Sequence, residues 1–274
     1  MARYQELPNR DGSNAVCACA VVPDLTMCQN YAMSFDCIIS AGAIGKNKID
    51  VYCTSCSFTV PSGVTSIFIE MWGAGGGGSG NGNCCCCTGG IPGGAGAYTA
   101  ATIPTASGCV YTICAGTGGN MGCGACGAGS AGNSSYVTGF NISTFCAGGG
   151  RGACNICNGG SMYCCGTNWC NDTSVPSVSG TTILNNAVQA CGEGGHVFGK
   201  ASGCRFEAAS GAAPMAGGAH VWTSYNHCCP CSMNSPGPGG QFPGGGGGAA
   251  YMACCCGGCN CGGCGAAGLV RVWF

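Results

Sequence analysis

Hydrophobic and polar positions alternate most regularly in Ser66–Trp72, whose sequence is SIFIEMW. Ile67, Ile69 and Met71 occupy every second position, which is the period of a β-strand, and the bulky or β-branched residues of this run favour strands. The turn-forming sequence Pro-Ser-Gly at positions 61–63 precedes it. The alternation stops at Trp72, and glycine then dominates almost to the end of the chain. The rest of the fold is therefore expected to be organised around this strand.

Other short runs predict further strands. Ile49–Cys53 precedes the turn, and the chain closes on Leu269–Phe274, where Val270 and Val272 alternate with polar or aromatic neighbours. A strand at each end of a glycine-rich middle suggests that the two pair in one sheet, with the middle leaving that sheet and returning to it. We therefore expect an all-β fold, a β-sandwich formed by the first and last strands with long glycine-rich loops. The remaining strand candidates are Ala97–Ile103, Val110–Ala115, Ser135–Val137 and Ile142–Cys146.

Glycine is concentrated from Gly73 onward, since only four of the 56 glycines precede that residue. A disordered linker is one reading, but tyrosine, tryptophan, isoleucine and cysteine interrupt the glycine too often for it. The other reading is packed extended chain, because glycine lets backbones lie side by side. Runs such as 75–78, 148–150 and 244–248 could form three-residue-per-turn helices bonded to one another, as in polyglycine II. No strict Gly-X-Y period occurs, so collagen is excluded.

Composition limits how such a chain can be stabilised. Only 6% of residues are charged, the net charge is −1, and isoleucine, leucine, valine and phenylalanine make up about 15% of the chain. Neither nucleic acid nor an anionic membrane is implied as a partner. Ordering so much glycine is costly in entropy. We therefore expect disulfide cross-links and self-association, specifically a homotrimer in which glycine-rich segments of neighbouring subunits touch.

The first 56 residues differ from the rest in being poor in glycine and relatively rich in charge. Asp24 could cap a short helix that runs to about Ile39. No secretory signal and no run long enough to span a membrane is present. We expect residues 1–56 to be an attachment segment and residues 57–274 to be a glycine-rich β domain; an ordinary N-terminal subdomain is the alternative for the first.

Six stretches in order carry a resemblance to a known family: FTVPSGVTSIFIEMWGAGGGGSG, GGAGAYTAATI, VYTICAGTGG, AGGGRG, GGGGGAAY and GAAGLVRVWF. Together they resemble the glycine-rich domain of bacteriophage tail fibre and receptor-binding (adhesin) proteins, over about Ser57–Phe274. The resemblance implies a virion structural component, commonly trimeric, that exposes host-recognition loops. The chain departs from the family in its 31 cysteines.

The cysteines allow three interpretations. Several have Cys-x-x-Cys spacing, which lets two thiolates reach one metal ion, so structural zinc is possible; iron–sulfur spacings are not matched. Free thiols are the second interpretation. A distributed disulfide network fits cysteines spread over the whole chain best, and the odd count leaves at least one thiol free or intermolecular. The disulfide candidates are Cys53, Cys56, Cys84, Cys85, Cys86, Cys87, Cys123, Cys126, Cys154, Cys157, Cys254, Cys255, Cys256, Cys259, Cys261 and Cys264.

The sequence shows no pattern of a catalytic site. Nucleophile elbows, HExxH and paired carboxylates do not occur, and no P-loop lysine follows the abundant glycines. We therefore expect no enzyme, no cofactor and no dedicated metal site, although His227 beside Cys228 and Cys229 leaves a Cys/His site open. Exposed aromatics next to asparagine and threonine suit sugars. The speculative receptor-binding residues are Trp169, Trp222, Tyr225 and His227, each of which could instead be a packing residue.

These observations favour a virion protein that is made in the host cytoplasm and exposed on the released particle. That location reconciles the cysteine content with the missing secretory signal. The expected partners are further copies of the chain, other virion proteins through the N-terminal segment, and a host cell-surface receptor, possibly a glycan. The alternatives are a capsid decoration or capsid fibre protein and a cysteine-rich metal-binding protein.

Overall fold

The computed structural model describes residues 48–80, 88–124, 127–140, 142–154, 177–179, 185–192, 195–197, 206–214, 220–223, 234–235, 237–252 and 261–274. These residues form strands and extended chain, without a helix. None of them belongs to a helix long and apolar enough to cross a membrane. The short helix expected between Asp24 and Ile39 lies outside the described residues. The expected all-β class is confirmed.

The first five-stranded sheet contains the strand with the clearest alternation, β3 (Ser66–Trp72), at its centre. Strand β16 (Leu269–Trp273) lies between β3 and β1 (Ile49–Tyr52), antiparallel to both. On the other side of β3 come β5 (Tyr98–Pro104) and then β10 (Asn185–Ala190). The expected pairing of the first and last strands is therefore confirmed.

The second five-stranded sheet has the order β2-β6-β7-β8-β9 and is antiparallel throughout. The sequence pattern missed β2, a four-residue strand directly before the Pro-Ser-Gly turn. The described β unit also begins before residue 57, because β1 pairs with β16. The strands are β2 (Cys56–Thr59), β6 (Val110–Cys114), β7 (Ser135–Gly139), β8 (Ile142–Ala147) and β9 (Ser177–Ser179).

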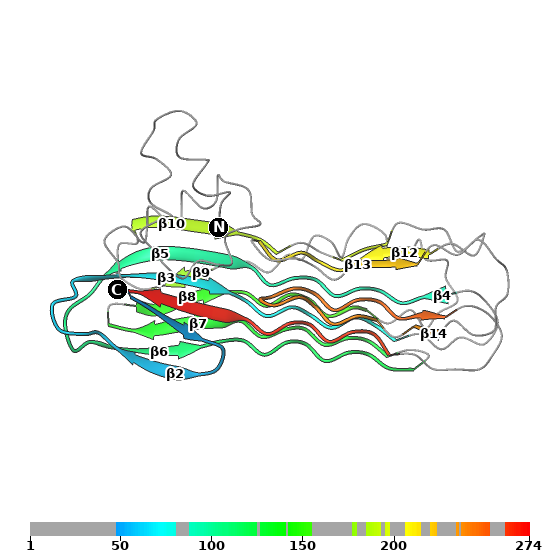
Figure 1. Ribbon diagram of the computed structural model, residues 1–274, viewed down its shortest axis with the longest axis horizontal. Helices are drawn as coiled ribbons and strands as arrows, with labels where there is room; N and C mark the ends of the chain where they lie inside the picture. Colours follow the sequence, from blue (N-terminus) through cyan, green and yellow to red (C-terminus); the bar gives the residue numbers. More distant parts are fainter. Residues whose placement is uncertain are drawn as a thin grey trace, which may run out of the picture.

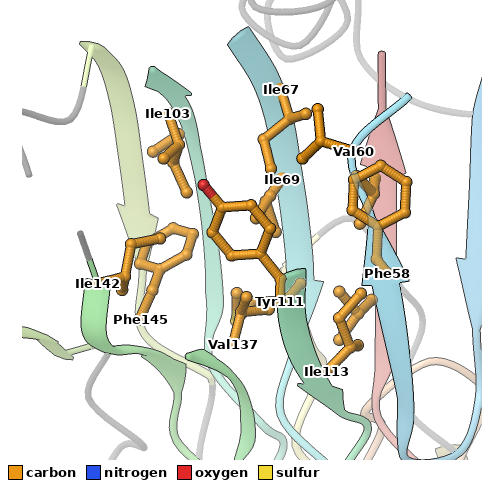
Figure 2. Close-up of a cluster of buried hydrophobic side chains, with 14 of the residues drawn as sticks. Phe58, Val60, Ile67, Ile69, Ile103, Tyr111, Ile113, Val137, Ile142 and Phe145 are labelled. Atoms are coloured by element: carbon orange, nitrogen blue, oxygen red, sulfur yellow. The ribbon is translucent and has the colours of Figure 1, made fainter. Parts of the chain in front are cut away.

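These two sheets face each other across the main hydrophobic core. The alternating residues of β3 and β16 pack against aromatic and β-branched residues of the second sheet, and all are buried. Figure 2 shows Tyr111 and Phe145 reaching into the space between the sheets, with Ile67 and Ile69 opposite. The aromatic rings supply much of the buried area of this core, because each buries more surface than an aliphatic side chain does.

Two three-stranded sheets lie beyond the sandwich. One has the order β11-β12-β13, from β11 (His196–Val197), β12 (Phe206–Ala209) and β13 (His220–Thr223). The other has the order β14-β15-β4, from β14 (Asn234–Ser235), β15 (Tyr251–Met252) and β4 (Thr88–Gly89). Figure 1 shows the sandwich at one end of an elongated molecule and these short strands toward the other. Long wavy chains run side by side between them.

Candidate functional site: the glycine bundle and its surface

The wavy chains form a bundle around a central chain, residues 73–80, which continues directly from β3. Its backbone amides donate hydrogen bonds with a period of three residues. The amides of Gly73, Gly76 and Ser79 donate at 2.8 Å to one neighbouring chain, residues 90–97, at Ala97, Gly94 and Ile91 respectively. The amides in the other two registers reach two other chains, residues 127–133 and 262–268. A chain with three residues per turn therefore points its donors in three directions.

The carbonyls of the central chain repeat the pattern with three further chains, residues 116–122, 148–153 and 244–250. Ala74 O accepts from Gly150 N at 2.7 Å, and Gly77 O accepts from Ala153 N three residues later, at 2.9 Å. Gly75 O and Gly78 O accept from residues 116–122, and Gly76 O and Ser79 O accept from residues 244–250. The central chain thus donates to three antiparallel neighbours and accepts from three parallel ones.

The six outer chains also bond to one another and close a ring around the centre. The order around the ring is 90–97, 148–153, 127–133, 116–122, 262–268 and 244–250, and antiparallel and parallel chains alternate. Typical links are Gly93 N to Gly247 O at 2.8 Å and Gly132 N to Gly150 O at 2.9 Å. The result is a seven-chain hexagonal bundle, the polyglycine-II-like packing that the sequence indicated, and it includes all three glycine runs named above.

Glycine is required in the centre because the chains are too close for a Cβ atom. A Cβ at Gly76 would lie 1.9 Å from Arg151 O, and one at Gly77 would lie 2.0 Å from Asn120 O. Both are contacts with backbone, which cannot rotate away. The central chain is buried from Gly73 to Ser79, so its polar groups depend on these neighbours for hydrogen bonds. The bundle therefore stabilises itself through the backbone, without a large aliphatic core.

A disulfide joins two adjacent chains of the bundle near the end remote from the sandwich. It links Cys123 to Cys261, which are 138 positions apart in the sequence. Both were among the disulfide candidates, and the sequence left their pairing open. Cys264 is a free thiol and Cys126 lies outside the described residues.

The remaining candidates divide into two groups. Cys53, Cys56 and Cys154 are exposed free thiols in the structure, and so is Cys264. No group of three or more metal-ligating side chains gathers among the described residues. The other candidates lie outside them: Cys84, Cys85, Cys86, Cys87, Cys126, Cys157, Cys254, Cys255, Cys256 and Cys259. Extensive oxidation of the cysteines stays a prediction.

We expect the Cys123–Cys261 bond to make a large contribution to stability. Closing a loop of this length restricts the unfolded chain by up to about 5 kcal/mol in the loop-entropy account. Replacing both cysteines by serine should lower the urea midpoint of unfolding accordingly. Cys264→Ser, which removes an exposed free thiol, is the matched control and should leave the midpoint unchanged. Equal midpoints for the double variant and the wild type would contradict the prediction.

The outer face of the first sheet carries a buried charged cluster. Glu70 and Arg271 lie opposite each other on β3 and β16, with 3.5 Å between Oε2 and Nη1. Tyr98 donates its hydroxyl to Glu70 Oε1 at 3.1 Å. Arg271 also lies over the Trp72 ring, 5.1 Å from its centroid. The sequence pattern did not predict this cluster, because the alternation in the strand places Glu70 at a position expected to be exposed.

Burial dominates the protonation of this cluster. It raises the pKa of Glu70, against the opposing effects of Arg271 and the Tyr98 hydroxyl. It also raises the pKa of Tyr98 well above its usual value, and the Glu70 charge adds to that shift. Burial likewise raises the pKa of Tyr52, to about 12. The folded state therefore disfavours the tyrosinate form.

Alkaline pH should consequently destabilise the fold. A tyrosine whose pKa is raised by folding contributes stability below the unfolded pKa of about 10, and loses it as pH rises through the folded pKa. We expect the free energy of unfolding to fall steeply above about pH 10. Tyr98→Phe should be less stable at neutral pH, having lost the bond to Glu70, but should show a shallower alkaline decline. Urea unfolding of the wild type and Tyr98→Phe across this pH range gives the slope of the unfolding free energy against pH for each protein. Parallel curves would contradict the assignment of the alkaline decline to Tyr98.

One exposed side of the bundle is uncharged and regular. Asn133 Nδ2 donates to Thr117 Oγ1 at 2.7 Å, and one turn along, Asn120 N donates to Ser130 Oγ at the same distance. All four residues are exposed. They bridge the chains 116–122 and 127–133, which lead out of β6 and into β7. Uncharged polar groups thus recur at three-residue intervals on this surface, and they, instead of charged side chains, are what it presents to water.

Of the four speculative receptor-binding residues, only Trp222 belongs to the described part of the chain. It lies in β13, opposite Glu207 of β12. Trp169, Tyr225 and His227 lie outside the described residues, so the structure does not bring the four together or separate them.

Comparison with protein families gives a match over most of the chain. The family described as a glycine-rich domain matches residues 52–274. The matched range starts at the last residue of β1. It includes all the other strands of the two five-stranded sheets and the whole bundle. No curated protein matches the chain.

Proposed function

We propose, since the chain belongs to the glycine-rich domain family over residues 52–274, that it is a structural protein of a bacteriophage particle. In this proposal it is a tail-fibre or adhesin subunit that projects from the virion and exposes surfaces for host recognition. The residues that precede β1 attach it to other virion proteins, and three copies assemble through their glycine-rich segments.

The observation that carries the proposal is the position of the two ends of the described unit. Lys48 and Phe274 exchange backbone hydrogen bonds, at 3.1 Å from Lys48 N and 3.0 Å from Phe274 N. Both ends therefore lie together at the sandwich, and the bundle extends away from it (Figure 1). A protein attached through residues 1–47 would hold the sandwich next to the particle and direct the far end of the bundle outward.

The construction of the bundle supports a mechanical role. Every chain in it is tied laterally to its neighbours, and the central chain is tied in all six directions. At a rise of about 3.1 Å per residue, eight residues extend about 25 Å. Such a unit resists bending without needing a wide hydrophobic core, which suits a projecting element.

Quantitative mass spectrometry of purified particles tests the proposal. A tail fibre should be present in small multiples of three or six copies, and the isolated protein should have the native mass of a trimer. Tens to hundreds of copies would indicate a capsid decoration or capsid fibre protein instead. Absence from the particles, combined with stoichiometric zinc or iron in the purified protein, would favour the cysteine-rich metal-binding alternative.

A further inference from the structure

An eighth glycine-rich chain lies on the outside of the seven-chain bundle. Residues 237–240 occupy the groove between two outer chains, 262–268 and 244–250, and run in the same direction as the first of these. The wall formed by 262–268 supplies carbonyls and the wall formed by 244–250 supplies amides. The bonds to the two walls include Gly240 N to Cys264 O at 2.8 Å and Gly248 N to Pro238 O at 2.7 Å. An outer groove of the bundle therefore accepts a further extended chain when one wall offers carbonyls and the other offers amides.

A second groove with the same pair of walls lies between chains 116–122 and 262–268, and we call it the open groove. In chain 116–122, two of the three amide registers point to the central chain and toward chain 127–133, so the third points to the open groove. In chain 262–268, two carbonyl registers point to the central chain and toward residues 237–240, so the third again points to the open groove. The groups in these two registers have no hydrogen-bond partner among the described residues. They are Gly118 N, Met121 N, Gly262 O and Gly265 O.

The open groove is accessible and uncharged. Gly118 and Gly265 are half-buried, and Met121 and Cys264 are exposed. Its two walls run along the side of the bundle away from β12 and β13 (Figure 1). A row of unpaired amides beside a row of unpaired carbonyls is the counterpart, in a glycine bundle, of the free edge of a β-sheet, which is a template for pairing with another chain.

Chain 127–133 carries the complementary groups on its outer side. Ala128 and Ala131 are exposed, and neither their amides nor their carbonyls have a hydrogen-bond partner among the described residues. The amides of the other two registers donate to the neighbouring chains 148–153 and 116–122, so those of the two alanines point outward. In hexagonal packing the alanine carbonyls point along the next direction of the hexagon, which lets one chain donate to one wall of a groove and accept from the other.

We propose that the open groove receives chain 127–133 of a second copy of this protein. The amides of Ala128 and Ala131 donate to the carbonyl wall, and their carbonyls accept from the amide wall. Chain 127–133 leads toward the sandwich, as chain 262–268 does, so the two run in the same direction, as in the groove that residues 237–240 fill. The three chains contain no charged residue, so the contact buries no charge.

The same contact closes into a ring of three copies. An extended chain with three residues per turn has threefold symmetry about its own axis, so hexagonal packing continues when a copy is rotated by a third of a turn. Each copy has one open groove and one chain 127–133, and such a head-to-tail contact forms a closed ring when the rotation closes. The inference rests on the proposed function, since it names the surfaces through which the three copies assemble.

Ala131→Pro in the full-length protein tests the inference. Proline lacks the amide that the contact needs, and its fixed φ suits an extended chain with three residues per turn. Because Ala131 N has no partner within the described part of the subunit, the subunit should keep its melting temperature. Sedimentation should show a wild-type trimer, and the variant should dissociate at a concentration at least about tenfold higher, since each of the three contacts loses a hydrogen bond. Ala131→Ser, which keeps the amide, is the matched control and should assemble as the wild type does.

Three results would overturn the inference: a wild type that is a monomer at every concentration, a wild type that stops at a dimer, or a trimer that Ala131→Pro leaves unchanged. Ala131→Glu keeps the test valid if Ala131→Pro misfolds, because it puts a charge into the contact while the side chain of the isolated subunit stays in water. Particle analysis separates the two proposals. Ala131→Pro present on particles in unchanged multiples of three would overturn this inference alone, whereas absence of the wild type from particles would overturn the proposed function.

Discussion

Replacing Gly76 by alanine should strongly destabilise the folded state. The added methyl carbon would lie 1.9 Å from Arg151 O and 2.3 Å from Arg151 C. Relief would require two backbones to separate in the middle of the bundle, where each is bonded to other chains. Overpacking a well-packed interior by one methyl group costs about 1–3 kcal/mol when side chains can adjust. Here the obstacle is backbone, so the cost should be at least about 3 kcal/mol, the upper end of that range.

Gly239→Ala is the matched control for this substitution. Gly239 lies in the same glycine-rich region, but a Cβ there would meet only Cys264 O, at 3.8 Å. Alanine also restricts the unfolded chain, so the variant should be neutral or more stable by up to about 1 kcal/mol. Soluble yield and urea unfolding of both variants provide the measurement. A Gly76→Ala protein that unfolds at the wild-type midpoint would show that the central chain is not packed as described.

Deleting Leu269–Phe274 should have an effect of similar size. This segment contains β16, which lies between β1 and β3, so its loss removes hydrogen bonds on two sides. Leu269, Val270, Val272 and Trp273 are each at most 1% exposed. Burying four such side chains contributes roughly 6–12 kcal/mol, which is comparable to the whole stability of a typical domain.

The deleted protein should therefore accumulate in the insoluble fraction. A variant that keeps Phe274 and adds six glycine and serine residues after it is the control. It changes the C-terminus without removing the strand, and should stay soluble. Soluble, cooperatively unfolding protein after the deletion would contradict the central position of β16.

The sandwich could be predicted from the sequence because its signals are local. Ile67, Ile69 and Met71 mark the buried face of β3 by their spacing, and Val270 and Val272 do the same for β16. The pairing of these strands followed from their places at the two ends of the glycine-rich stretch. Strand β2 escaped prediction because four residues beginning with cysteine and serine carry too little alternation to be recognised.

The sequence predicted close packing of glycine-rich backbones, but not which chains are neighbours in the bundle. Glycine runs indicate close backbone packing, yet a run such as 75–78 looks the same whichever chains surround it. The three-residue register becomes visible only when the partners of Gly73, Gly76 and Ser79 are known. The same limit applies to Cys123, whose partner Cys261 is adjacent in the bundle but 138 positions away in the sequence.

The sequence singled out Trp222 as a speculative receptor-binding residue but could not place it in the fold. Its backbone lies in β13, opposite Glu207 of β12. That register depends on pairing between strands separated by ten residues of chain, which no local pattern specifies.

The central claim is the proposed place of the chain on a phage particle. A reconstruction of that particle, with the chain located by an antibody fragment against the far end of the bundle, tests it most directly. The account predicts a threefold projection in which the sandwich lies next to the particle and the antibody fragment marks the outer tip. Density for the chain with the bundle directed inward, or particles that carry no copy of it, would contradict the account.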